Sequence, residues 1–243
     1  MTLLDEPVEL ADVAKLPPEY ADTLIHQLAA NGEGELSAGD TYVDSFYPLS
    51  PTADERYKCM QFAMEEVDHY RRFARLLAAL GKDVGYMVHQ PKNERTYFPA
   101  DSMTVHFQTW EERAAFSFLC ELEGHYQINE MVTSTYAQLA REASAILKEE
   151  AGHFAHGVAL MKQAAGREDS RARAQAAVER FYPMALDMFG RSESRRSETA
   201  VRWGLRRHTN GRLRELYERE VAQHLVRLGY TVPAHDPAKR RFV

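Results

Sequence analysis

Apolar and polar residues recur along most of this chain with the period of an α-helix. A first helical segment opens at Pro17-Pro18-Glu19 and continues through apolar residues at helical spacing. These residues are Tyr20, Leu24, Ile25, Leu28 and Ala29. Because Gly32, Gly34 and Gly39 are poor helix formers, we expect this segment to meet another backbone closely or to be locally irregular.

A second helix is predicted from Ser50-Pro51 to Gly81. A serine hydroxyl caps a first helical turn, proline suits the first helical position, and glycine closes a helix in the left-handed conformation. The two helices would form a hairpin that turns at residues 48–50. The periodicity fails over residues 82–108, and a connection of this length is typical of one that crosses the length of a helical bundle.

A third helix opens at Thr109-Trp110-Glu111-Glu112, which fits a capping box. A fourth helix is predicted from about Tyr136 to Gly166, after a turn at residues 134–136. Methionine and aromatic residues at helical spacing are expected in the core or in a pocket wall. These residues are Phe62, Met64, Phe116, Tyr126, Phe154 and Met184.

The remaining chain continues the helical pattern beyond four helices. A fifth helix follows Glu168-Asp169-Ser170 and ends at Gly190, with a kink expected at Pro183. Two shorter helices flank a break at residues 209–211, and a loose tail follows. We therefore expect one all-α domain over residues 1–243, with a four-helix bundle core over about 17–166 and a C-terminal helical extension over about 168–243.

Composition narrows the class of protein. The chain has 243 residues and a formal net charge of −6, which argues against nucleic acid as a general partner. The acidic start lacks a secretory signal, and no uncharged apolar run of about 18 residues predicts a membrane span. Cys59 and Cys120 lack the close spacing of a metal or disulfide motif and are expected in the core. These features predict a cytoplasmic protein.

Two matching motifs lie midway along the second and fourth helices. Each has an acid, a Glu, two spacers and a His: Glu65-Glu66-x-x-His69 and Glu149-Glu150-x-x-His153. A single Glu-x-x-His arises readily by chance in a helical chain with ten His, but two copies with a preceding acid do not. Residues three apart share a helix face, so each Glu and His pair can bind one metal ion.

A two-metal centre in a four-helix bundle also needs one Glu from each of the other two helices. Counted from the predicted turns, Glu35 lies level with Glu66, and Glu121 lies level with Glu150. Nearby Glu33, Glu123 and Glu130 compete for these positions. A step of two residues turns a side chain about 200° around the helix, so only one of each close pair can face inward.

Four carboxylates and two imidazoles suit iron or manganese. A metal-bound His normally donates its other ring N–H to a carboxylate or carbonyl, which fixes the orientation of the ring. Glu65 and Glu149 are therefore predicted to orient the metal-binding His residues. His125 and His156 lie one turn from predicted ligands and are expected to be hydrogen-bonded residues instead.

The order of these motifs resembles a known family. Beside the two metal motifs stand Gly34-Glu35-Leu36, Phe181-Tyr182-Pro183, Met188-Phe189-Gly190, Thr209-Asn210 and Leu228-Gly229-Tyr230-Thr231-Val232-Pro233. Together they are similar to the catalytic subunit family of bacterial phenylacetyl-CoA epoxidase, among the phenylacetic acid catabolic, ferritin-like di-iron oxygenases. The similarity covers nearly the whole chain.

This resemblance implies a ferritin-like bundle with two iron ions that inserts one oxygen atom from dioxygen into an aromatic ring held as a CoA thioester, such as phenylacetyl-CoA. The implied metal ligands and catalytic residues are Glu35, Glu66, His69, Glu121, Glu150 and His153, with Glu121 where the family has an Asp. The family also implies an oligomer that includes a homologous helical structural subunit. Electrons would come from a separate reductase, because no flavin or nicotinamide glycine fingerprint is present.

An arginine-rich stretch has a candidate use in this setting. Residues 191–214 contain eight Arg, and Arg side chains bind phosphate groups such as those of CoA well. The residues predicted to bind CoA are Arg202, Arg206, Arg207 and Asn210.

Two other functions stay open from the sequence. One is iron or manganese handling, or peroxide removal, by a ferritin-like protein, which would not need the long segment after Gly166. The other is a non-catalytic structural subunit of an oxygenase complex, which would keep the fold without the metal. The complete set of six candidate ligands argues against this last function.

Overall fold

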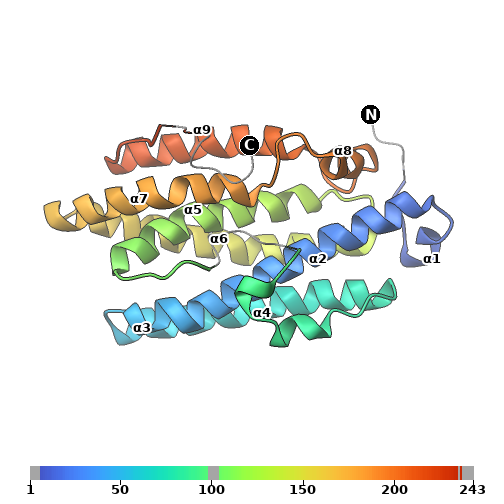
Figure 1. The fold of residues 1–243 in the computed structure, drawn as a ribbon, viewed down its shortest axis with the longest axis horizontal. Coiled ribbons are helices and arrows are strands. Elements are labelled where there is room, and N and C mark those ends of the chain that lie inside the picture. Colours follow the sequence, from blue (N-terminus) through green and yellow to red (C-terminus); the bar gives the residue numbers. More distant parts are fainter. Residues whose placement is uncertain (1–5, 98–103, 235, 237–243) are drawn as a thin grey trace.

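The computed structural model describes residues 6–97, 104–234 and 236, and these residues form helices and connections without a β-strand. Four long helices make the bundle (Figure 1). They are α2 (Pro18–Thr41), α4 (Ala53–Ala79), α5 (Trp110–Met131) and α6 (Ala137–Ala165). The short α1 (Leu10–Val13) precedes them. No described helix is long and apolar enough to cross a membrane.

The first hairpin pairs α2 with α4 and contains a π-helix. α2 passes directly into this π-helix (Tyr42–Phe46), and α3 (Tyr47–Leu49) follows before the turn. The predicted close approach is confirmed, because a Cβ atom at Gly32 or Gly39 would lie 3.2 Å from side-chain atoms of α4. The glycines thus let α2 lie tightly against α4.

The start of α4 differs from the prediction. Thr52, not Ser50, is the N-cap, and its side chain accepts a hydrogen bond from the Glu55 amide. The Ser50 hydroxyl instead donates to the Phe46 carbonyl, which closes the turn after the π-helix. At the other end, Gly81 adopts a φ of 77°, as expected of a glycine that ends a helix.

The second hairpin pairs α5 with α6, and its predicted capping box is confirmed. The Thr109 hydroxyl accepts from the Glu112 amide, and the Glu112 carboxylate accepts from the Thr109 amide. Farther along, α6 passes α5 at Gly157, where a Cβ atom would lie only 2.8 Å from the Phe118 nitrogen. Only glycine permits this contact without a shift of the backbone.

Three further helices cover one side of the bundle. α7 (Glu168–Met188) packs on α5 and α6 and continues as one helix through Pro183, while α9 (Asn210–Leu228) lies above α7 (Figure 1). The short α8 (Arg195–Arg202) reaches back to α2. The extension is therefore attached to both hairpins.

The connection after α4 carries two short 3-10 helices (Gly85–His89 and Lys92–Glu94). Arg95 then fixes it to α2, because its guanidinium donates to Ser37 Oγ at 2.6 Å and to Asp40 Oδ2 at 2.5 Å. The predicted crossing of the bundle includes residues 98–103, which lie outside the described part.

Two hydrophobic clusters fill the interior, one toward each end of the bundle. The first cluster contains Phe62 of α4 and Met161 of α6. The second contains Phe73 of α4 and Ile146 of α6. The candidate ligands of both helices lie between the clusters in sequence and are almost completely buried. They form a polar layer across the middle of the bundle.

Candidate metal centre

The six predicted ligand positions meet in this polar layer. α2 supplies Glu35, α5 supplies Glu121, and α4 and α6 each supply one Glu-x-x-His pair. They form two groups whose candidate ligand atoms lie within 4.8 Å of one another. The first group is Glu35, Glu66, His69 and Glu150, and the second is Glu66, Glu121 and His153.

Both imidazoles turn Nδ1 toward the carboxylates. Nδ1 of His69 lies 3.2 Å from Glu35, 3.3 Å from Glu150 and 3.6 Å from Glu66. Nδ1 of His153 lies 3.1 Å from Glu66 and 3.8 Å from Glu121. The oxygens and nitrogens of the group therefore converge on a small volume, as the ligands of a pair of metal ions do.

The Nε2 atoms of these imidazoles face a second pair of acids. His69 Nε2 lies 2.7 Å from Glu149, and His153 Nε2 lies 2.7 Å from Glu65. The spacing predicted that these two acids orient His residues, and the structure shows that each contacts the His of the opposite helix. α4 and α6 are thus joined twice across the centre, an arrangement we call the crossed braces.

The competing glutamates have other partners. Glu33 accepts a hydrogen bond from the Thr96 amide, Glu123 accepts one from Gln127, and Glu130 accepts from backbone amides just before α9. All three are buried, so they do not lie on a solvated helix face. Glu33 and Glu123 each lie two residues from a candidate ligand and therefore face away from it, and Glu130 lies nine residues, or two and a half turns, beyond Glu121.

Burial and mutual repulsion shift the titration of the carboxylates. Burial raises the pKa of Glu35 well above its usual value, and burial together with the Glu66 charge raises the pKa of Glu121 to about 7. Burial acts the same way on Glu66, but the adjacent His153 and His69 outweigh it and lower the pKa of this carboxyl. The pKa of His153 rises because neighbouring carboxylates outweigh its burial.

A cation fits this arrangement. Four carboxyl groups share one buried layer, and their charges repel one another unless protons or metal ions compensate for them. The Nδ1 atom of His153 is buried and, despite its short distance to Glu66, makes no hydrogen bond to any residue that the structure describes. An imidazole nitrogen of this kind, surrounded by carboxylate oxygens, is a suitable iron or manganese ligand.

Tyr42 is a site residue that the sequence did not reveal. It lies in the π-helix, and its buried hydroxyl donates to Glu121 Oε1 at 2.5 Å. The guanidinium of the fully buried Arg113 lies 5.7 Å from the centre of the Tyr42 ring and similarly close to Phe46 and Trp110. Periodicity cannot predict a π-helix, so it gave no reason to place Tyr42 beside a carboxylate.

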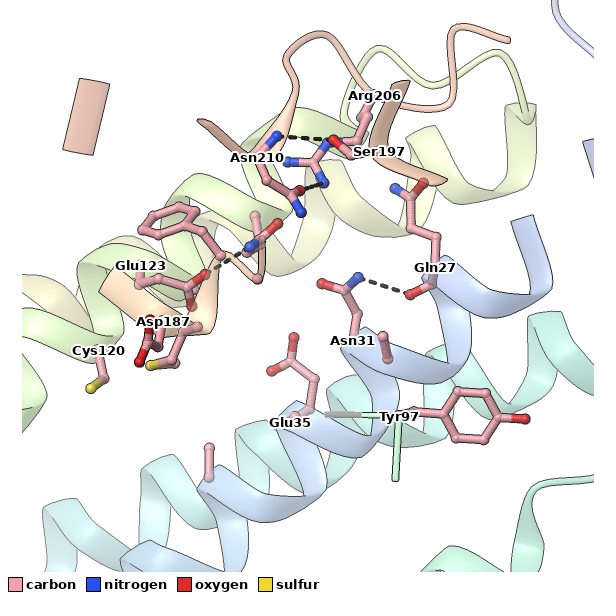
Figure 2. Close-up of a pocket in the computed structure, with 18 of the residues that line it drawn as sticks. Gln27, Asn31, Glu35, Tyr97, Cys120, Glu123, Asp187, Ser197, Arg206 and Asn210 are labelled. Carbon is pink, nitrogen blue, oxygen red and sulfur yellow. Dashed lines mark hydrogen bonds between the residues drawn. The ribbon is translucent and has the colours of Figure 1, made fainter. Parts of the chain in front are cut away.

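A cavity of about 290 Å³ extends from this layer toward the extension. Glu35, Glu66, Glu121 and Glu150 contribute to its inner end, beside small or apolar residues such as Ala38 and Phe116. Figure 2 shows Glu35 facing the open space from α2, with Asn210, Ser197 and Arg206 across it. The cavity thus joins a carboxylate-rich end to a polar end.

The four residues predicted to bind CoA have different surroundings. Arg206 and Asn210 line the cavity, and Arg206 Nη1 donates to Asn210 Oδ1 at 3.0 Å. Arg202 pairs with Glu19 at 2.5 Å, and Arg207 donates to the Asn129 carbonyl. Arg202 lines a neighbouring surface hollow, whereas Arg207 does not line the cavity.

The surface hollow adjoins the cavity, since Thr23 and Arg196 line both. It also contains Arg195, which the sequence-based prediction does not include. The cluster of arginines in the sequence was the signal for this residue, but only the fold shows which arginines face the same hollow.

Of the methionine and aromatic residues expected in the core or a pocket wall, Phe62 and Phe116 are buried, and Tyr126, Phe154 and Met184 are partly buried against the same cluster, whereas Met64 is not. Its side chain is 69% exposed, so the prediction for this residue was wrong. Met64 lies two residues before Glu66 and therefore points to the opposite side of α4 from the metal centre. His156 bonds to Glu55 at 3.1 Å and belongs to neither ligand group, in line with its predicted role.

Comparisons with known proteins show the family of the chain. The model of the family described as phenylacetic acid catabolic protein matches residues 7–241. The chain is 25% identical over 228 residues to a subunit of the 1,2-phenylacetyl-CoA epoxidase of Escherichia coli (strain K12), and the match covers 91% of this chain and 72% of that protein. The fold is all-α and ferritin-like, as predicted, and the chain belongs to the phenylacetic acid catabolic protein family.

Proposed function

We propose that this chain is the catalytic component of a di-iron monooxygenase that acts on an aromatic acyl-CoA such as phenylacetyl-CoA. The observation that carries the proposal is the pair of carboxylate and imidazole groups at the inner end of a cavity. Membership of the phenylacetic acid catabolic family and similarity to one component of an epoxidase support the reaction class.

Two iron ions would be held by Glu35, Glu66, His69, Glu121, Glu150 and His153. Manganese suits the same ligands. When bound, the metal pair supplies the activation of dioxygen and the transfer of one oxygen atom to the aromatic ring. Glu65 and Glu149 hold the two imidazoles in the orientation that keeps Nδ1 directed at the centre.

The inner cavity would hold the aromatic ring. Ala38, Phe116 and Cys120 provide apolar surface beside the carboxylates, and Gly124 leaves space next to Glu150, since a Cβ atom there would lie 3.3 Å from Glu150 Oε2. An apolar ring in this space displaces water from the centre and lies against its carboxylate-rich face.

The CoA portion would extend outward. A cavity of about 290 Å³ is at the lower end of the range of about 300–1,000 Å³ for small-molecule sites, so a whole CoA thioester does not fit inside it. The adjoining hollow brings Arg195, Arg196 and Arg202 together beside the acids Glu19, Asp22 and Glu198, and its arginines would pair with the phosphate groups.

Electrons would come from a separate reductase, and a homologous helical subunit would complete an oligomer. Support comes from the relative in Escherichia coli, which is described as one subunit of its enzyme.

The test combines metal analysis with turnover. The purified chain is loaded anaerobically with Fe(II), its iron is counted, and a chemical or enzymatic reductant, dioxygen and phenylacetyl-CoA are added. We expect two irons per chain and an oxygenated thioester product. His153→Ala should lose iron and product, while His156→Ala, a His outside the ligand groups, should retain the iron.

Other outcomes identify the alternatives. Iron binding without any effect of the thioester would indicate metal handling or peroxide removal. Absence of metal binding, with the fold intact, would indicate a structural subunit. Either result would contradict the proposed function.

A further inference from the structure

Arg206 is a buried guanidinium with unused hydrogen-bond donors. Its Nη1 atom donates to Asn210, but its Nε and Nη2 atoms are buried and have no hydrogen-bond partner among the described residues. A buried donor without a partner destabilises the fold, and such groups are rare in native proteins. Because Arg206 lines the cavity, an acceptor on a ligand can reach these donors.

The position of the guanidinium is fixed by its neighbours. Asn210 accepts a hydrogen bond from this guanidinium, and its side-chain Nδ2 donates to the Arg191 carbonyl. The backbone N–H of Asn210 donates to Ser197 Oγ at 2.9 Å. The nearest buried acids are already engaged, because Glu123 binds Gln127 and Glu130 binds backbone amides. Arg206 is therefore oriented before any ligand enters.

The charge of the cavity selects the kind of acceptor. Six carboxyl side chains line it: Glu35, Glu66, Glu121, Glu123, Glu150 and Asp187. A phosphate group would bring about two further negative charges into this space, whereas a carbonyl oxygen accepts hydrogen bonds without adding charge. The outer hollow has as many arginines as acids and faces solvent, which screens its charges, so a phosphate group meets less repulsion there.

We infer that Arg206 binds the thioester carbonyl oxygen of the acyl group through its Nε and Nη2 atoms and does not bind the phosphates of CoA. This inference rests on the proposed function and sharpens it, because it makes Arg206 the residue that distinguishes an acyl-CoA from free CoA. Arg206 also sets how deep the acyl group reaches toward Glu35, which faces it across the cavity (Figure 2).

The experiment measures binding of phenylacetyl-CoA, CoA and phenylacetate to the metal-free chain by calorimetry. The variants are Arg206→Gln, Arg206→Lys and the control Arg212→Gln, an arginine of α9 that pairs with Glu215 and lines neither the cavity nor the hollow. Because Arg206→Gln loses hydrogen bonds from a charged donor, its affinity for phenylacetyl-CoA should be about 10- to 100-fold lower than that of the wild type. Binding of CoA should change less than about 2-fold, and the control should bind all three as the wild type does.

Several results would overturn the inference. If Arg206→Gln weakens the binding of CoA and of phenylacetyl-CoA by the same factor, the arginine contacts the phosphates or the pantetheine arm. If phenylacetyl-CoA binding does not change, Arg206 has no ligand role. Circular dichroism checks the fold of each variant, and if Arg206→Gln does not fold, Arg206→Lys carries the test, because lysine keeps the charge but loses the guanidinium fork.

The inference and the proposed function can fail separately. Selective weakening of phenylacetyl-CoA in Arg206→Gln, combined with an iron-loaded chain that makes no oxygenated product, would support the inference and contradict the oxygenase. Turnover that Arg206→Gln leaves unchanged in both kcat and KM would support the oxygenase and contradict the inference. Selective loss of phenylacetate binding would show that the acceptor is a free carboxylate, which also contradicts it.

Discussion

The two halves of the candidate metal centre have the same kinds of candidate ligand but different support. In the first half, Glu35 contacts His69, and no hydroxyl or amide of the described residues bonds to the carboxylate. In the second half, Glu121 accepts a 2.5 Å hydrogen bond from Tyr42. Burial does not explain the difference, because the Glu35 and Glu121 side chains are 11% and 10% exposed.

This comparison shows what the π-helix contributes. It places Tyr42 over the second half, with Phe62 and Arg113 against the Tyr42 ring, while the described residues give the first half no counterpart. We therefore expect the Glu121 carboxylate to be held in place and the Glu35 carboxylate to be freer to move. A pair of otherwise similar metal positions would then differ in affinity and in response to mutation.

The largest effect should come from the carboxylate common to both halves. Glu66 belongs to both ligand groups, so Glu66→Ala should remove both metal ions. Glu35→Ala and Glu121→Ala should each leave one. Metal analysis per chain checks this, with the exposed Glu94→Ala as the control. Two ions retained in Glu66→Ala would show that the halves do not share this ligand.

The crossed braces should give the next largest effect. Loss of an acid that orients a metal-binding His typically weakens metal affinity about 10- to 100-fold. Because each brace reaches the opposite helix, Glu65→Gln should weaken the half with His153, and Glu149→Gln the half with His69. Stepwise Co(II) titration followed by absorbance separates the two sites. If the mutation instead lowered the metal affinity of the half whose His lies on the same helix as the mutated acid, the pairing would be contradicted.

A smaller and one-sided effect is expected at the tyrosine. Tyr42→Phe removes the hydrogen bond to Glu121 and should weaken metal binding in the second half about 10-fold, at the lower end of the range for such partners. The first half should keep its affinity. Equal weakening of both sites in the same titration would show that the support of Glu121 by Tyr42 does not distinguish the halves.

The smallest effect concerns His156, which packs against Phe62 behind the second half. Burial, with the charges of Arg113 and Lys58, lowers the pKa of His156 to about 4. The unfolded chain takes up this proton near pH 6.5, so the free energy of unfolding should fall as the pH decreases from about 6.5 to 4. Urea unfolding of the metal-free chain measures this, and His156→Gln should flatten the pH dependence. An unchanged slope would mean that His156 is already charged in the fold.

The sequence predicted which six candidate ligands come together because their positions depend on local rules. Glu66 and His69 share a helix face by spacing alone, and the level of Glu35 follows from a count of residues to the turn. The helix ends at Gly81 and Thr109 were predictable for the same reason, since capping depends on adjacent residues.

The remaining features depend on contacts between distant segments. Which brace reaches which His depends on how α4 crosses α6, and this crossing has no pattern in either helix. The same holds for Arg206, whose unused donors are defined by a cavity built from α2, α5 and the start of α9. The N-cap of α4 was mispredicted although capping depends on adjacent residues, because Ser50 and Thr52 both have a suitable hydroxyl. Ser50 bonds to the Phe46 carbonyl of the π-helix, and Thr52 caps α4.

Gly157 lies four residues after His153, and the backbone that it touches lies about one helical turn before Glu121. A single methyl group there would separate α5 from α6 next to the ligands, and both Glu121 and Glu150 would move apart with their helices. The glycine therefore acts as the spacer of the ligand cage although it offers no atom to an ion. The distance between α5 and α6 beside the candidate ligands is thus fixed by the residue with the smallest side chain.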